Sequence, residues 1–89
     1  MSVRIGVIGA GFIGRVHMRT FAALAGAEVT ACADASAELA GAAATELGIP
    51  HVFPDASELI NSRHVDAVVI AVPNLFHAPL TVKALTAGK

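Results

Sequence analysis

Two hydrophobic patterns alternate along the chain. Short runs of branched apolar residues, typical of buried strands, are followed by longer segments in which apolar residues recur every three to four positions, as in helices. The changes between patterns fall near glycine, proline, serine or aspartate, which end strands or cap helices. The predicted strands cover residues 3–8, 28–33, 51–53 and 65–72, and the predicted helices cover residues 12–24, 36–47, 55–61 and 77–87.

The first two predicted helices each have an apolar face that we expect to pack against the core. In the second helix this face consists of Leu39, Ala43 and Leu47, and Ser36 is placed to cap the helix N-terminus. Asp55 begins a similar capping sequence for the third helix. The face of the first helix consists of Ile13, Val16, His17, Thr20, Phe21 and Leu24.

The order of the elements predicts the fold class. Strands alternate with helices, and the strands are apolar enough to be buried on both faces. This βαβαβαβα order is typical of an α/β fold, a Rossmann-type doubly wound parallel sheet with helices on both sides. A further strand is expected after the last helix. We therefore expect residues 1–89 to be one incomplete domain, the N-terminal part of a larger dinucleotide-binding domain.

The amino-acid composition indicates which classes of binding partner the chain lacks the residues for. The chain is 55% hydrophobic and 15% charged with formal net charge −1, so it lacks the basic surface that nucleic acids require. No apolar run reaches the roughly 20 residues that span a bilayer. The single cysteine, Cys32, cannot form an internal disulfide; it fits a small core residue and a reducing compartment, and we expect a cytoplasmic protein. The four histidines are not clustered with acids or cysteines, so no metal site is predicted.

The strongest chemical signal lies where the first strand meets the first helix. Gly9, Gly11 and Gly14 form the pattern Gly-x-Gly-x-x-Gly. In dinucleotide-binding folds the first glycine permits a tight turn, the second lets the pyrophosphate approach the backbone, and the third lets the helix pack closely on the sheet. The helix N-terminus then offers N–H groups to the phosphates. A Walker phosphate loop is excluded, because Arg15 and Val16 occupy the positions where that motif has lysine followed by serine or threonine.

An acid at the end of the second strand completes the dinucleotide signature. Asp34 lies 20 positions beyond Gly14, where a carboxylate can accept hydrogen bonds from an adenosine ribose. A carboxylate there repels a 2′-phosphate, and residues 35–37 supply no arginine to hold one, so NAD is favoured over NADP. FAD uses the same fold and is not excluded by the motif. The structural alternative is that the glycines only make a tight turn and Asp34 only begins the next helix.

The fourth strand ends in AVPNLFH, residues 71–77, at the sheet edge expected to carry the glycine loop. Pro73 and Asn74 would therefore face the cofactor, although Asn74 suits a turn or helix cap equally well. His77 is either near the site or a surface histidine. The predicted cofactor-binding residues are Gly9, Gly11, Phe12, Ile13, Gly14, Asp34, Ala71, Pro73, Asn74 and His77.

Four stretches together resemble the N-terminal domain of the glucose–fructose oxidoreductase, inositol dehydrogenase and rhizopine-catabolism family (Gfo/Idh/MocA). They are VRIGVIGAGFIGRVHMR, ACADAS, ELGIP and DAVVIAVPNLFHAPLTVKALTAGK, and the resemblance covers essentially all 89 residues. It implies a two-domain oxidoreductase in which a Rossmann domain binds NAD or NADP and a second α/β domain holds the substrate and the oligomer interface. Hydride would pass between nicotinamide and a sugar, inositol or related polyol. Pro73 and Asn74 would lie along the nicotinamide, and His77 belongs to the same motif.

The resemblance assigns no catalytic residue to this sequence. The family's Glu-Lys-Pro motif, which carries the lysine implicated in catalysis, follows the segment that matches residues 87–89. We therefore expect these residues to bind the cofactor without turnover. The full-length protein is expected to be a homo-oligomer with a small-molecule substrate and no nucleic-acid or membrane partner. Two alternatives use the same residues: a sensor module that binds NAD(H) without chemistry, and an interaction domain that binds no ligand.

Overall fold

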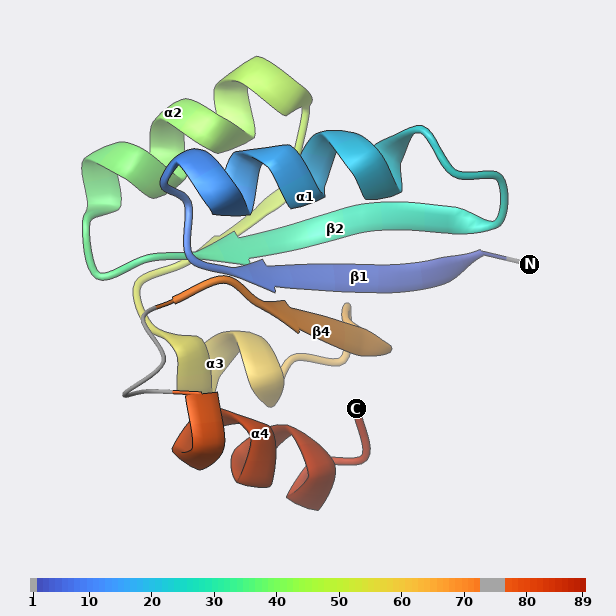
Figure 1. Ribbon diagram of the computed structural model, residues 1–89, viewed down its shortest axis with the longest axis vertical. Helices are drawn as coiled ribbons and strands as arrows, with labels where there is room; N and C mark the ends of the chain where they lie inside the picture. The colour runs from blue at the N-terminus through green and yellow to red at the C-terminus, as the bar shows by residue number, and fades with distance from the viewer. Residues whose placement is uncertain (1, 73–76) are drawn as a thin grey trace.

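The computed structural model describes residues 2–72 and 77–89. Strands and helices alternate along the chain, as the sequence predicts (Figure 1). The elements are β1 (Val3–Ile8), α1 (Phe12–Ala22), β2 (Ala27–Ala33), α2 (Ala37–Leu47), β3 (His51–Phe53), α3 (Ala56–Ile60), β4 (Ala67–Ile70) and α4 (His77–Thr86).

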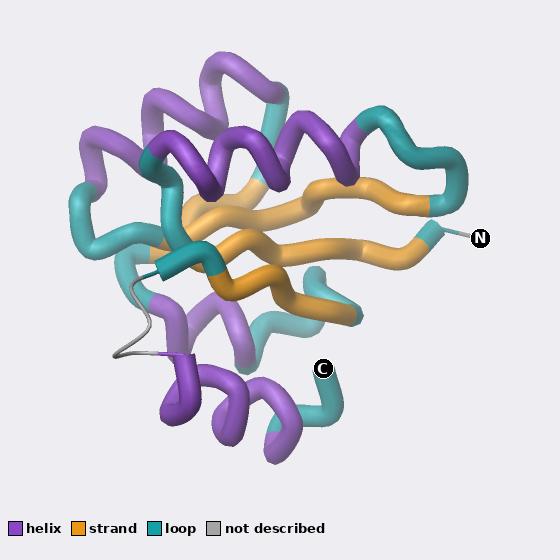
Figure 2. Tube along the Cα trace, viewed as in Figure 1, coloured by secondary structure: helices purple, strands orange, loops and turns teal. Residues whose placement is uncertain are grey.

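The four strands form one parallel sheet in the order β3-β2-β1-β4. Helices α1 and α2 cover one face of the sheet, and α3 and α4 cover the other (Figures 1 and 2). This arrangement confirms the predicted doubly wound α/β fold. The strand order reverses at β1, because β2 and β3 are added on one side of it and β4 on the other.

A separate apolar core fills the space on each side of the sheet. Met18 and Ala40 pack on the face covered by α1 and α2, and Leu59 and Ala84 pack on the opposite face. Gly6 brings α3 close to β1, because a Cβ at this position would lie 2.6 Å from the Leu59 Cδ2 atom. The absence of a side chain at Gly6 therefore lets Leu59 of α3 pack directly on β1.

The predicted apolar face of α1 is wrong except at Phe21. Its buried residues are Gly14 and Met18, with Phe21 packed partly against the core, whereas Ile13 is 56% exposed and Leu24 50% exposed. Val16 and Thr20 are also exposed, and His17 is half-buried. The physical reason is Gly14, which must face the glycine loop at the closest approach of helix and strand. That constraint rotates the helix so that positions 14, 18 and 21 face the sheet.

Two further expectations need correction. In α2 the prediction is wrong at Leu39, which is 42% exposed, while Ala43 is buried and Leu47 packs partly against the core as expected. Ala40 takes the buried position beside Ala43. Strand β4 is shorter than predicted and only half-buried along its length, because it is an edge strand that pairs with β1 alone among the described strands. Position within the sheet, rather than apolar composition, therefore decides burial here.

The predicted helix caps are confirmed. The Ser36 hydroxyl accepts a hydrogen bond from the Leu39 N–H over 3.2 Å, and the Asp55 carboxylate accepts one from the Glu58 N–H over 2.8 Å. Within the described ranges 2–72 and 77–89, no helix combines the length and hydropathy needed to cross a bilayer.

Candidate functional site

The loop between β1 and α1 lies at the point where the strand order reverses. In doubly wound sheets this reversal opens a crevice at the carboxyl ends of the strands, where ligands bind. The ends of β1, β2 and β4 meet there: the Ala71 N–H donates to the Ile8 carbonyl over 2.8 Å, and the Gly9 N–H donates to the Ala33 carbonyl over 2.8 Å. The glycine loop is thus tied to both neighbouring strands.

Gly9 and Gly14 are required by the fold itself. Gly9 has φ of +104°, and a Cβ there would lie 2.3 Å from the Ala71 carbonyl oxygen. A Cβ on Gly14 would lie 1.8 Å from the Gly9 carbonyl oxygen. Both clashes are with backbone, which cannot move aside as a flexible side chain can. These two glycines make the turn and let α1 approach the strand, as their predicted roles require.

Gly11 differs from both. Its φ of −75° is accessible to any residue, and a Cβ there would meet no atom within 4 Å. Neither backbone strain nor packing within the described protein therefore requires glycine at this position. The missing side chain leaves open space directly in front of α1.

The N-terminus of α1 faces this open space without a side-chain cap. The first helical hydrogen bond runs from the Arg15 N–H to the Gly11 carbonyl over 3.0 Å, so the N–H groups of residues 12–14 have no partner within the helix. The first turn contains no acidic residue to offset the positive end of the helix dipole. Phe12 is 79% exposed at the same end, with Ile13 beside it. The arrangement suits an anion.

The Asp34 carboxylate lies beside the glycine loop and holds it in place. One oxygen accepts a hydrogen bond from the Ala10 N–H and the other from the Ser36 N–H, each over 2.8 Å. The residue is half-buried, and each carboxylate oxygen retains a lone pair for a further donor such as a hydroxyl. Asp34 thus has a structural role beside its predicted ligand role, but the side-chain cap of α2 is Ser36.

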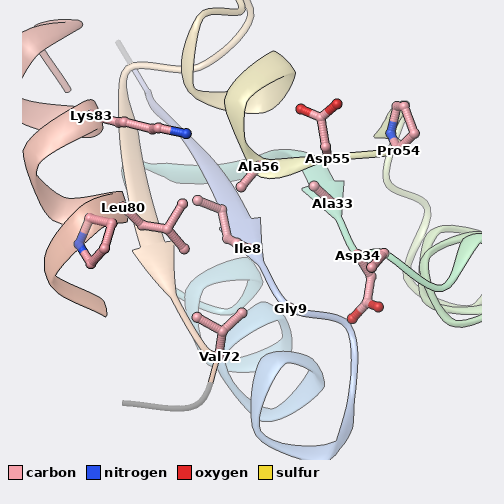
Figure 3. A pocket seen from close by; sticks show the side chains of 12 residues that line it. Ile8, Gly9, Ala33, Asp34, Pro54, Asp55, Ala56, Val72, Leu80 and Lys83 are labelled. Atoms are coloured by element: carbon pink, nitrogen blue, oxygen red, sulfur yellow. The ribbon is translucent and has the colours of Figure 1, made fainter. Parts of the chain in front are cut away.

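A cleft of about 480 Å³ continues from Asp34 between the ends of β1 and β2 on one side and helices α3 and α4 on the other (Figure 3). Its walls are mostly apolar, with charged side chains at the margins. Such a slot suits a flat ring with few polar atoms. The lining residues are Ile8, Gly9, Ala33, Asp34, Ala35, Pro54, Asp55, Ala56, Val72, Pro79, Leu80 and Lys83.

Of the predicted site residues whose side chains the structure describes, Gly9 and Asp34 line this cleft and the others do not. Gly11, Phe12, Ile13 and Gly14 belong to the adjacent helix N-terminus, and the Ala71 carbonyl faces Gly9. His77 is the first residue of α4. The predicted contacts of Pro73 and Asn74 lie outside the described residues.

Sequence reasoning missed the cleft walls beyond these two residues. Pro54 follows β3 directly, so the rule that ligands lie at strand ends could have identified it. Leu80 and Lys83 are three positions apart and share one face of α4. No motif marks that pair, because nothing in the local sequence says which face of α4 meets the strand ends.

Two ionisable residues that do not line the cleft, Cys32 and Glu46, have structural roles. Burial, with a smaller effect from the Asp34 carboxylate, raises the pKa of the Cys32 thiol, so this residue is a neutral core side chain as predicted. Glu46 on α2 forms ion pairs with Arg15 and Arg19 on α1, which hold the two helices together. Among the residues that the structure describes, no group of three histidine, cysteine or acidic side chains could hold a metal ion.

The sequence and fold match known oxidoreductases. The chain is 43% identical over 91 residues to inositol 2-dehydrogenase 1 of Saccharopolyspora erythraea and 41% identical to inositol 2-dehydrogenase of Azotobacter vinelandii. Each alignment covers 100% of this chain and 27% of the relative. The chain therefore spans about a quarter of the length of these relatives.

Solved structures agree with the sequence relatives. Myo-inositol dehydrogenase from Lactobacillus casei, in complex with NAD(H) and myo-inositol, superimposes with a TM-score of 0.90 at 36% identity over 97% of this chain and 26% of that one. Scyllo-inositol dehydrogenase from Lactobacillus casei, with bound NAD(H) and scyllo-inositol, gives a TM-score of 0.94 at 31% identity over 100% of this chain and 26% of that one. Residues 3–89 match the model of the oxidoreductase family with the NAD-binding Rossmann fold, and the chain therefore belongs to this family, Gfo/Idh/MocA.

Proposed function

We propose that this chain is the NAD-binding part of an oxidoreductase that transfers hydride between NAD(H) and an inositol or related polyol. The observation that carries the proposal is the open space at Gly11, between the uncapped N-terminus of α1 and the Asp34 carboxylate. The inositol dehydrogenases among its relatives support the substrate class.

The residues present fit a dinucleotide. Its pyrophosphate would rest over Gly11 against the N–H groups of residues 12–14, where the helix dipole favours negative charge. Asp34 would accept hydrogen bonds from the adenosine ribose, using the lone pairs that Ala10 and Ser36 leave. The adenine ring would enter the apolar cleft beyond Asp34. Backbone N–H groups and the Asp34 carboxylate would therefore make the polar contacts to the dinucleotide.

NAD fits this site better than NADP. A 2′-phosphate would be attached to the ribose that Asp34 holds, and the two negative charges would repel each other. The Ala35-Ser36-Ala37 segment carries no cation to offset that repulsion. NADP-binding members of this fold class use a nearby arginine for the purpose.

The bound nicotinamide would supply the hydride chemistry, and the residues of this chain would hold and orient the cofactor. We assign no catalytic residue to it. The proton-transfer groups would come from the remainder of a longer protein, where the family's Glu-Lys-Pro motif belongs, and residues 1–89 would be one incomplete cofactor domain. We also propose a cytoplasmic homo-oligomer for the whole enzyme. The buried free thiol of Cys32 fits the reducing compartment.

The test is titration of the protein with NADH, followed by nicotinamide fluorescence and calorimetry. Gly11→Val should abolish measurable binding, because its side chain would fill the space in front of α1, while circular dichroism stays unchanged. Gly41→Val is the matched control, since Gly41 on α2 also has nothing within 4 Å of a built Cβ but lies in a different element. The control should bind as wild type does.

Two results would count against the proposal. A cooperatively folded wild-type protein that gives no signal at millimolar NADH would exclude dinucleotide binding. Equal affinities for wild type and Gly11→Val would mean that the open space is not the phosphate site. Turnover of an inositol by the longer protein separates an enzyme from a sensor that only binds NAD(H).

A further inference from the structure

Lys83 lies at the end of the cleft opposite Asp34. Among the described residues that line the cleft it is the only basic one, and its side chain extends from α4 across the opening toward α3 (Figure 3). Its ammonium donates a hydrogen bond to the Ser57 hydroxyl over 3.0 Å. The ammonium group has three N–H donors, so this contact leaves two for a ligand.

The space between Asp34 and Lys83 is bounded by apolar groups. Ile8 and Ala33 contribute from the strand ends, Leu80 from α4, and Ala56 from α3. A planar base attached to a sugar at Asp34 would enter this space, because Asp34 itself lines the cleft and the walls beside it are apolar. Its far edge would then point toward Lys83.

The hydrogen-bond acceptors at the edge of an adenine ring match the N–H donors of the Lys83 ammonium. Adenine has unprotonated ring nitrogens that accept hydrogen bonds, and the apolar side chains of these walls carry no donor for them. A nitrogen taken from water into such a cleft without a partner costs free energy. Among the described residues of the cleft, Lys83 carries the one charged side chain that can donate such a hydrogen bond.

We propose that Lys83 positions the base: its ammonium donates a hydrogen bond to a ring nitrogen at the edge of an adenine seated between Leu80 and Ala56. This inference rests on the proposed dinucleotide function and adds a specificity-determining residue to it. Lys83 touches the adenine half of the ligand only. Its loss should therefore weaken ligands that contain adenosine and spare those that do not.

The experiment compares Lys83→Met, Lys83→Arg and Ser57→Ala with the wild-type protein. Methionine keeps the length and helix propensity of lysine at an exposed position but removes the donor. NADH and ADP-ribose both contain adenosine diphosphate, whereas reduced nicotinamide mononucleotide lacks it. We expect Lys83→Met to weaken NADH and ADP-ribose by about five- to tenfold and to leave the mononucleotide unchanged. Lys83→Arg, which keeps a donor, should restore most of the affinity.

Ser57→Ala separates this role from a purely structural one. It removes the Lys83–Ser57 hydrogen bond between α3 and α4 but keeps the ammonium, so NADH affinity should stay within about twofold of wild type. If Ser57→Ala causes the same loss as Lys83→Met, Lys83 acts only as a strut between the helices. Unchanged affinity in Lys83→Met, or an equal loss for the mononucleotide, would also overturn the inference. A wild-type protein that binds none of the three ligands would instead refute the proposed function, and this inference with it.

Discussion

The Asp34 carboxylate accepts a hydrogen bond from the Ala10 N–H over 2.8 Å, which joins the end of β2 to the glycine loop. The same side chain is the proposed ribose acceptor. Loop shape and ligand recognition are therefore coupled through one carboxylate, because any change that removes the acceptor also releases the Ala10 and Ser36 N–H groups.

Asp34→Ala should weaken NAD binding more than NADP binding. The variant loses a ribose acceptor for NAD but also loses the repulsion of the 2′-phosphate, and the two effects oppose each other for NADP only. Dissociation constants for NADH and NADPH, measured on both proteins, check the prediction. Equal losses for the two cofactors would contradict the recognition role and leave Asp34 as a loop tether.

The same substitution should lower the free energy of unfolding by about 1–3 kcal/mol, because two backbone donors lose a charged acceptor. Asp34→Asn is the matched variant, since its amide oxygen can still accept one of the two hydrogen bonds. Urea unfolding should place Asp34→Asn between wild type and Asp34→Ala. The reverse order would show that the tether contributes little to stability.

Gly14→Ala should be far more destabilising than Gly11→Ala. A Cβ at position 14 meets the Gly9 carbonyl oxygen, so α1 would have to shift away from the strand, at a cost of about 3 kcal/mol or more. A Cβ at position 11 meets nothing, and its cost should remain within about 1 kcal/mol. Thermal and urea unfolding of the two variants provide the comparison. Similar stabilities would mean that the loop can relax around Gly14.

Features that depend on hydrogen bonds between residues close in the sequence could be predicted from the sequence alone. The caps at Ser36 and Asp55 act within three residues of themselves, so their sequences alone predict them. The orientation of α1 was not predictable from its apolar spacing, because the close approach of Gly14 to the Gly9 carbonyl, across the turn between β1 and α1, determines it. Burial of β4 depends likewise on its place in the sheet. Lys83 reaches the cleft only through the packing of α4, which no local pattern encodes.

Lys89→Met should lower the free energy of unfolding by about 1–2 kcal/mol without affecting NADH binding. The Lys89 ammonium donates to the Ser62 carbonyl over 2.9 Å and also to the Val65 carbonyl, so it ties the end of α4 to the segment before β4. These contacts lie at the opposite end of β4 from the glycine loop. Urea unfolding of the Lys89→Met variant tests the expected loss of stability, and NADH titration of the same variant tests the unchanged binding. Weakened binding with unchanged stability would contradict this structural role.

The rings of His51 and His64 are stacked, with centroids 4.0 Å apart and an interplanar angle of 14°. Desolvation lowers the pKa of His64, and the nearby His51, Arg63 and Arg4 lower it further. As the pH falls through about 6.5, His64 therefore binds a proton in the unfolded chain, whereas in the folded state it stays neutral until the pH is lower. Stability should be full above that pH and decrease as the pH falls below it.

His64→Gln should flatten this part of the pH–stability curve, measured by urea unfolding at intervals from pH 8 to pH 5. Asp66, whose effect on stability depends on a lower pH range, serves as the internal control. Hydrogen bonds from Arg4 lower the pKa of Asp66 to about 2, so its contribution is present above the ordinary carboxyl pKa of 3.8 and is lost only as the pH falls toward 2. Asp66→Asn should leave the curve between pH 8 and pH 5 with its wild-type shape. If His64→Gln retains the wild-type slope in that range, the stacked pair does not set the pH dependence.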